Sequence, residues 1–191
     1  MMIAMTRYEV YDHAGQIPLN EWHSSGIEVP VFDKDNTLTS FHDSQFIDEV
    51  IKGLIANGLP DLFPIIALVS NSNNPKYMQG VGSDLGKRLG GVDVLTVCQS
   101  DGYPSKPNPA MGLRVAKLLG AHTHELGIIG DRRLIDVRFG TRLGAGRIAL
   151  CHKVGYGDAC GVPTLRRIES VLVGVECVLG IAGDHSLMSE K

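Results

Sequence analysis

Short apolar runs that alternate with segments of helical periodicity limit the folds open to this chain more than any other feature of its sequence. Five runs rich in β-branched residues predict strands, at 27–33, 65–70, 94–98, 126–131 and 147–151. Strands that alternate with helices form right-handed βαβ units, and near-continuous apolar strands are covered on both faces. The sequence therefore predicts an α/β fold, a three-layer sandwich with a mostly parallel central sheet.

The segments between these runs predict helices over 43–57, 75–89, 108–119 and 134–143. The first has apolar residues at helical spacing, and the third begins with Asn and Pro and ends at Gly120, the usual asymmetry of helix ends. Pro30 conflicts with a central position for the first strand, because proline cannot donate to a sheet ladder. We expect Pro30 at a bulge or among the first residues of that strand.

The length and composition are those of an ordinary globular protein. The chain has 191 residues, of which 43% are hydrophobic and 20% are charged. We expect one domain over residues 1–191, with a core at about 27–152 and a C-terminal helix at about 163–180. The net charge of −3 argues against general nucleic-acid binding, and no nucleic-acid partner is predicted.

Cysteine usage and the absence of long apolar runs predict the compartment. The four cysteines lie far apart without a CxxC pair, which is typical neither of a secreted disulfide scaffold nor of a zinc site. The sequence has no signal-peptide pattern at its start and no apolar run of the length that crosses a bilayer. We therefore expect a reduced, cytoplasmic protein.

Polar residues follow the predicted strands at the positions where an open α/β sheet binds its ligands, beyond the carboxyl ends of the strands. Three carboxylates in one place would repel one another unless a cation lay among them, and hard oxygen ligands suit Mg²⁺. The sequence therefore predicts a Mg²⁺ site with Asp33, Asp35 and Asp131 as ligands. Asp136 and Arg132 are further candidates for the site.

A phosphate bound at such a site is open to in-line attack by a carboxylate. Asp33 is the candidate nucleophile, which would form an aspartyl-phosphate, and Asp35 is the candidate general acid for a poor alkoxide leaving group. Lys106 would offset the phosphate charge and hold Asp33 ionised, while Ser70 and Asn71 would contact the phosphate oxygens.

Four motifs carry a family resemblance. DKDNTLT (33–39), VSN (69–71), SKPNP (105–109) and GDRRLIDV (130–137), in that order, resemble the motifs of the haloacid dehalogenase (HAD) superfamily of phosphohydrolases. The resemblance covers residues 27 to about 169 and implies a Rossmann-like core. The implied roles are nucleophile for Asp33, acid/base for Asp35, phosphate-binding hydroxyl for Ser70, motif-three lysine for Lys106, Mg²⁺ ligand for Asp131 and second motif-four acid for Asp136.

One branch of this superfamily is more similar than the others. DKDNT in place of the commoner DxDGT, together with the later motifs and Arg-Arg-Ile-Glu at 166–169, resembles the mitochondrial and bacterial phosphatidylglycerophosphate phosphatases. This resemblance implies hydrolysis of phosphatidylglycerophosphate to phosphatidylglycerol. Ile135 departs from the pattern, because the branch usually carries Thr there.

The spacing of the motifs predicts that no cap domain is inserted, as in the capless subclass III. Asp33 and Ser70 lie 37 positions apart, and Ser70 and Lys106 lie 36 apart, which leaves room for little more than a helix and a strand in each interval. A capless site suits a substrate with its own bulk, such as an anionic lipid headgroup. Capless members can also close over a small substrate by forming oligomers.

A basic stretch predicts peripheral contact with a membrane. Residues 132–153 contain six basic residues and one acidic residue, and each basic residue near an anionic surface contributes about 1 kcal/mol. The apolar stripe of the predicted C-terminal helix could also dock at a bilayer interface. The competing interpretations are a solvated helix face for the basic stretch and a core position for the stripe.

Other functions remain open at this point. The same fold could hydrolyse a soluble sugar, nucleotide or protein phosphate. A non-enzymatic receiver-like signalling domain also uses Asp, Ser or Thr and Lys around Mg²⁺, but its motifs come in a different order. A dehalogenase is disfavoured because the departure of a halide needs no proton from Asp35.

Overall fold

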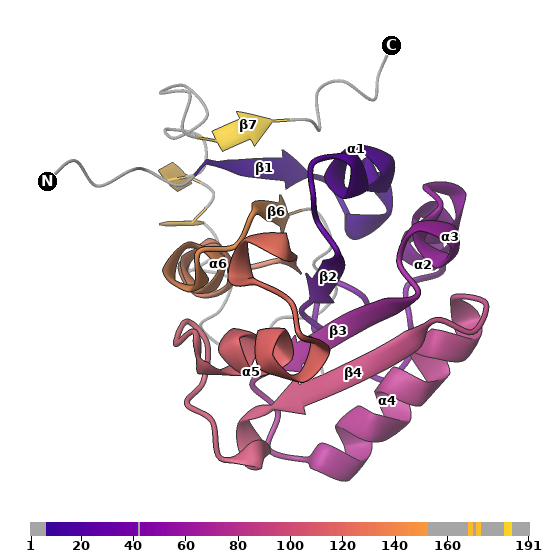
Figure 1. Ribbon diagram of the computed structural model, residues 1–191, viewed down its shortest axis with the longest axis vertical. Helices are drawn as coiled ribbons and strands as arrows, with labels where there is room; N and C mark the ends of the chain where they lie inside the picture. Colours follow the sequence, from indigo (N-terminus) through magenta and orange to yellow (C-terminus); the bar gives the residue numbers. More distant parts are fainter. Residues whose placement is uncertain (1–6, 42, 153–167, 170, 173–181, 185–191) are drawn as a thin grey trace, which may run out of the picture.

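A single parallel sheet organises the computed structural model, which describes residues 7–41, 43–152, 168–169, 171–172 and 182–184 (Figure 1). Within these residues the sheet has seven strands in the order β4-β3-β2-β5-β6-β1-β7, and each neighbouring pair is parallel. The strands are β1 (Tyr8–Tyr11), β2 (Val29–Phe32), β3 (Ile65–Ser70), β4 (Asp93–Cys98), β5 (Leu126–Gly130), β6 (Arg147–Cys151) and β7 (Ala182–Asp184). The predicted α/β fold is confirmed.

Helices cover both faces of the sheet. On one face lie α1 (Leu19–Ser24), α2 (Asp48–Ala56), α3 (Leu59–Leu62) and α4 (Pro75–Arg88), and on the other lie α5 (Ala110–Leu119) and α6 (Arg138–Leu143). The described residues also include short helical turns: η1 (Ala14–Gln16), η2 (Gln99–Asp101), η3 (Thr123–Glu125) and the π-helical turn η4 (Arg133–Val137).

The hydrophobic core is divided by the sheet into two layers. Leu68 of β3 packs with the cluster under α1 to α4, and its neighbour Val69 packs with the cluster under α5 and α6. Successive side chains of a strand point to opposite faces. Because both faces are covered by helices, the central strands are apolar throughout, which explains why they were recognisable in the sequence.

The predicted helix at 43–57 begins later than expected, at Asp48. The preceding residues fold back on the loop after β2: Ile47 N donates to Leu38 O at 2.9 Å, and Phe46 forms an isolated bridge with Thr39. These contacts hold 43–47 in a loop despite its helical periodicity. The predicted helix at 134–143 is divided into η4 and α6, and the one at 108–119 begins at Ala110.

Strands β1 and β7 and helices α1 and α3 were not predicted, and β1 extends the sheet beyond the expected core of 27–152. Strand β1 has only four residues, and one of them is the charged Glu9. Its carboxylate pairs with Arg147 and accepts hydrogen bonds from Tyr11 OH at 2.5 Å and Trp22 Nε1 at 3.3 Å. Two of these partners, Arg147 and Trp22, are distant from Glu9 in the sequence, so the periodicity of the strand cannot reveal them.

Pro30 lies in a central strand, at its second residue. The ladder between β2 and β3 begins one residue later, at Val31, while the ladder with β5 includes Pro30 opposite Gly127. Proline is thus accommodated where one of the two ladders has not yet begun, which is one of the two solutions expected from the sequence.

The predicted C-terminal helix at about 163–180 lies mostly outside the described residues. Residues 168–169 and 171–172 are helical, and of these Glu169 is buried while Ile168, Val171 and Leu172 are exposed. Within the part of the chain that the structure describes, no helix is both long enough and apolar enough to cross a membrane.

Candidate active site

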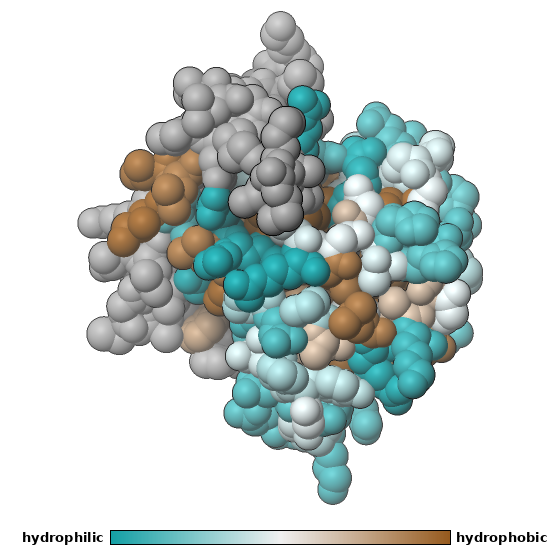
Figure 2. All heavy atoms as spheres, turned by 60° about the vertical axis from the view of Figure 1, so that its left-hand side comes forward, coloured by the Kyte–Doolittle hydropathy of each residue, from teal (hydrophilic) through white to brown (hydrophobic). Residues whose placement is uncertain are grey.

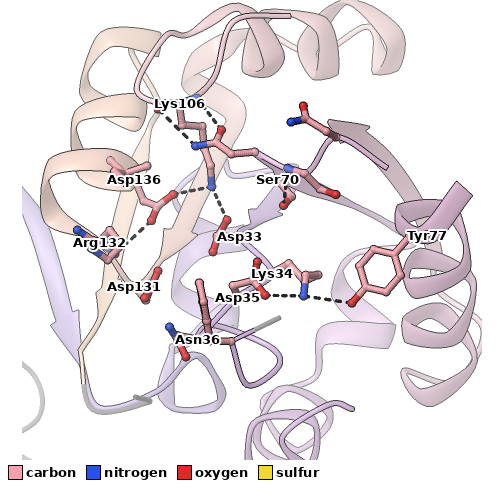
Figure 3. Close-up of a pocket in the computed structure, with 15 residues that line it drawn as sticks. Asp33, Lys34, Asp35, Asn36, Ser70, Tyr77, Lys106, Asp131, Arg132 and Asp136 are labelled. Atoms are coloured by element: carbon pink, nitrogen blue, oxygen red, sulfur yellow. Dashed lines mark hydrogen bonds and ion pairs between the residues drawn. The ribbon is translucent and has the colours of Figure 1, made fainter. Parts of the chain in front are cut away.

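The polar residues predicted to converge line one cavity of about 450 Å³ at the carboxyl edge of the sheet (Figure 3). Asp33 follows β2, Ser70 ends β3, and Asp131 follows β5. All the candidate site residues line this cavity. The full lining consists of Asp33, Lys34, Asp35, Asn36, Phe41, Ser70, Asn71, Ser72, Asn73, Tyr77, Lys106, Asp131, Arg132, Ile135 and Asp136.

Lys106 bridges two carboxylates at the centre of this site. Its Nζ lies 2.5 Å from Asp33 Oδ1 and 2.7 Å from Asp136 Oδ1. Lys106 is 6% exposed and Asp136 is 2% exposed, so the ion pairs are shielded from water. The second oxygen of Asp136 accepts a hydrogen bond from Arg132 N at 3.1 Å. Asp136 thereby links the lysine to the start of the loop after β5.

Burial and neighbouring charges shift the pKa values of Asp33 and Lys106. Burial raises the pKa of Asp33 to about 6, and the charge of Asp136 adds to this effect, while Lys106 opposes it. Burial alone would lower the pKa of Lys106, but the charges of Asp136 and Asp33 outweigh burial and raise it above its usual value. Lys106 therefore stays protonated at neutral pH and supports an ionised Asp33.

Three carboxylates form a group that could hold a metal ion. Asp33, Asp131 and Asp136 each offer an oxygen, and these oxygens lie within 4.8 Å of one another. Carboxylate oxygens with room for water suit Mg²⁺, so the residues fit the expected ion. The group contains two of the three predicted ligands. The carboxylate of Asp35, the third, instead lies 2.5 Å from Lys34 Nζ.

The loop after β2 is folded around one carbonyl group. Lys34 O accepts hydrogen bonds from the backbone N–H groups of Thr37, Leu38 and Thr39. Asn36 has a φ of 58°, in the left-handed region that asparagine adopts more readily than most residues. This tight turn explains how two aspartates separated by one residue both reach the same cavity.

Asn71, a predicted phosphate ligand, makes its hydrogen bonds to the backbone of Lys106. Its Oδ1 accepts from Lys106 N at 2.7 Å, and its Nδ2 lies 3.5 Å from Lys106 O. The side chain therefore ties the loop that carries Lys106 to the end of β3. Ser70 is buried and lines the cavity, and its Oγ accepts from Ser72 N at 3.3 Å.

Several residues of the site were missed by sequence reasoning. Lys34 and Tyr77 line the cavity, and a lysine between two aspartates was the signal that could have indicated the first. Tyr77 comes from α4, where nothing in the sequence distinguishes it. Glu169 belongs to the Arg-Arg-Ile-Glu segment that carried part of the resemblance, but its contacts were not expected: it is buried and accepts hydrogen bonds from Arg132 Nε at 2.9 Å and from Leu134 N at 3.2 Å, so it holds the loop after β5.

The basic stretch at 132–153 is partly neutralised in the structure. Arg132 pairs with Glu169 and Arg147 pairs with Glu9, whereas Arg138 and Arg142 are exposed. Figure 2 brings forward the side that carries α6, where hydrophilic side chains gather at the centre of the face beside smaller hydrophobic groups. The local positive charge available to a partner is therefore smaller than the sequence count indicates.

The parallel sheet, the two aspartates after β2, the buried lysine and the acidic loop after β5 define a phosphatase of the HAD superfamily. A family model described as mitochondrial PGP phosphatase matches residues 10–155. The chain belongs to this family, and it is an enzyme, a phosphatase. The predicted superfamily and branch are confirmed.

The chain is similar to several solved structures at low sequence identity. An uncharacterized protein from Listeria monocytogenes serotype 4b is 16% identical, with a TM-score of 0.55 over 70% of this chain and 84% of that one. A HAD-superfamily hydrolase from Ehrlichia chaffeensis is 17% identical (TM-score 0.45; 72% and 65% covered). A haloacid dehalogenase-like hydrolase from Xanthomonas campestris is 11% identical (TM-score 0.43; 76% and 97% covered). A search of curated proteins found no match.

Proposed function

We propose that the protein is a Mg²⁺-dependent phosphomonoesterase that hydrolyses phosphatidylglycerophosphate to phosphatidylglycerol through an aspartyl-phosphate. The observation that carries the proposal is the placement of Asp33 in the cavity, 2.5 Å from Lys106 Nζ and within the carboxylate group formed with Asp131 and Asp136. Membership of the mitochondrial PGP phosphatase family supports the substrate.

The chemistry divides between the two aspartates after β2. A carboxylate oxygen of Asp33 attacks phosphorus, the bond from phosphorus to the ester oxygen breaks, and Asp35 gives that oxygen a proton. A water molecule then returns a proton to Asp35 and attacks the phosphorus of the acyl phosphate. Phosphate leaves, and Asp33 is restored as a carboxylate.

The surrounding residues bind and orient the phosphate. Lys106 offsets negative charge on the phosphate, and the Ser70 hydroxyl donates to a phosphate oxygen from its fixed position at the end of β3. Asn71 holds the Lys106 backbone in place through a 2.7 Å hydrogen bond. Mg²⁺, held by Asp33, Asp131 and Asp136, would supply positive charge that lets the carboxylates and the phosphate lie together.

A lipid headgroup is the substrate that we propose for this site. The chain between Asp33 and Lys106 is occupied by α2, α3, β3, α4 and β4, which supports a single domain without a cap. A site that does not enclose its ligand suits a phosphomonoester that protrudes from a bilayer. The protein would then work at a cytoplasmic membrane surface, with the exposed Arg138 and Arg142 available to anionic lipid.

Phosphate release tests this proposal directly. Phosphatidylglycerophosphate in mixed micelles is compared with soluble sugar, nucleotide and peptide phosphates, each with Mg²⁺ and with EDTA, for the wild type and for Asp33→Asn. We expect Mg²⁺-dependent release that strongly prefers the lipid and that Asp33→Asn abolishes. Release from a soluble ester alone would disprove the lipid substrate and favour the soluble alternative, and turnover retained by Asp33→Asn would disprove the mechanism.

A further inference from the structure

Lys34 is a buried cation in an unusual position, between the two aspartates of the loop after β2. It is 2% exposed, and its Nζ donates to Asp35 Oδ1 at 2.5 Å and to Asp43 O at 2.9 Å. The Thr39 and Tyr77 hydroxyl oxygens each lie 3.4 Å away. A buried charge is costly unless it is paired and hydrogen-bonded, so a lysine at this position is accommodated only because these groups surround it.

The contacts of Lys34 join three separate segments around Asp35. The lysine belongs to the loop after β2, Asp43 to the loop before α2, and Tyr77 to α4. Tyr77 OH also donates to Asp43 O at 2.9 Å, and the Tyr77 ring centre lies 5.4 Å from Lys34 Nζ. Figure 3 shows Asp35, Lys34 and Tyr77 in a row across the cavity. These contacts hold the Lys34 ammonium group in place beside the Asp35 carboxylate.

Each of the two aspartates after β2 is therefore paired with a lysine of its own. Lys106 binds Asp33 Oδ1 at 2.5 Å, and Lys34 binds Asp35 Oδ1 at the same distance. Asp33 lies within the carboxylate group that could hold a metal, and the Asp35 carboxylate is not a member of that group. A bond to one carboxylate oxygen restricts rotation about the Cβ–Cγ bond and fixes the direction of the other oxygen.

We propose that Lys34 is a positioning residue for Asp35, which holds its carboxyl group toward the leaving oxygen of the substrate and away from Asp33, Asp131 and Asp136. This inference rests on the proposed function, because the role of Asp35 as general acid belongs to it. Its consequence is specific: Lys34 matters for esters whose leaving oxygen needs a proton, and matters little for esters whose leaving group departs as a stable anion.

The test compares kcat/KM for two substrates, because kcat/KM includes departure of the leaving group but no later step. Phosphatidylglycerophosphate is an alkyl ester that needs a proton, and p-nitrophenyl phosphate is an aryl ester that does not. For Lys34→Met we expect kcat/KM to fall about 100-fold for the alkyl ester and less than about threefold for the aryl ester, since general acids contribute at least about 100-fold. Lys34→Gln provides the same comparison if the methionine variant does not fold.

Two further variants make the outcomes distinct. Lys87→Met removes an exposed lysine of α4 and should leave both rates unchanged. Asp35→Asn should show the same asymmetry as Lys34→Met. An equal loss for both esters in the Lys34 variants, with asymmetry kept in Asp35→Asn, would overturn the positioning role alone. Equal losses in Asp35→Asn would overturn the general-acid role in the proposed function, and the role of Lys34 with it.

Discussion

Asp33 carries a charge that its surroundings compensate only in part. One lysine, Lys106, faces two carboxylates, Asp33 and Asp136, in a setting shielded from water. Burial consequently raises the pKa of Asp33 to about 6, above its ordinary value of 3.8. A carboxylate that is ionised at neutral pH but poorly neutralised is ready to bind a cation, and the folded protein is less stable because of it.

Asp33→Asn is expected to stabilise the metal-free protein at pH 8 while it abolishes turnover. A carboxyl group whose pKa is raised on folding destabilises the folded state once it ionises, and a shift from 3.8 to about 6 corresponds to at most about 3 kcal/mol. This penalty is fully present above pH 6 and disappears as the pH falls from 6 toward 3.8. Urea unfolding in EDTA at pH 8 and pH 4 measures it.

The difference between the variant and the wild type should shrink at the lower pH, because the wild-type carboxyl group is then protonated in the folded state. Asp84→Asn, which removes an exposed carboxylate of α4, is a suitable control. A wild type at least as stable as Asp33→Asn at pH 8 would show that Lys106 fully compensates the charge.

At the scale of elements, burial decides what could be predicted. All five predicted strands occur, with ends within two residues of those expected, because each lies in the sheet and is mostly apolar. Strand β1 was missed since its Glu9 is stabilised by partners elsewhere in the chain. In the site, residues directly after strands were predictable, whereas Tyr77 reaches the cavity from within a helix.

Helix α2 packs closely on η1, which the sequence pattern did not indicate. The contact is made by two glycines, Gly53 of α2 and Gly15 of η1. A Cβ on Gly53 would meet Gly15 O at 2.6 Å and Gly15 Cα at 2.7 Å, and both are backbone atoms. Gly53→Ala should therefore destabilise the protein by about 1–3 kcal/mol, through overpacking of two elements that cannot easily separate. The free energy of unfolding in urea gives the measurement.

Gly80→Ala is the matched control for that substitution. Gly80 also lies within a helix, α4, but a Cβ there would meet nothing within 4 Å. The change should stabilise the protein by about 0.5–1 kcal/mol, because alanine has the higher helix propensity. Equal effects of the two alanines would mean that the contact between α2 and η1 does not limit the packing.

At the scale of the whole molecule, the site draws on distant parts of the chain at one edge of the sheet. Asp33 follows β2, Lys106 lies between β4 and α5, and Asp131 and Asp136 follow β5. Glu169, far along the chain, holds the loop of Asp131 through Arg132 and Leu134 N. A ligand bound among these groups contacts several segments that come together only in the folded state. Its binding therefore raises the free energy of unfolding of the whole molecule.

Mg²⁺ should therefore raise the unfolding temperature of the wild type, independently of any substrate. A ligand at a concentration of 100 times its Kd stabilises the folded state by about 2.7 kcal/mol, and for Mg²⁺ at pH 8 the gain includes relief of repulsion among Asp33, Asp131 and Asp136. Asp131→Asn removes a predicted ligand without touching Lys106 and should abolish this increase, whereas Asp84→Asn should retain it. Thermal unfolding monitored over a Mg²⁺ titration distinguishes the two variants, and an equal increase in both would place the ion outside the carboxylate group.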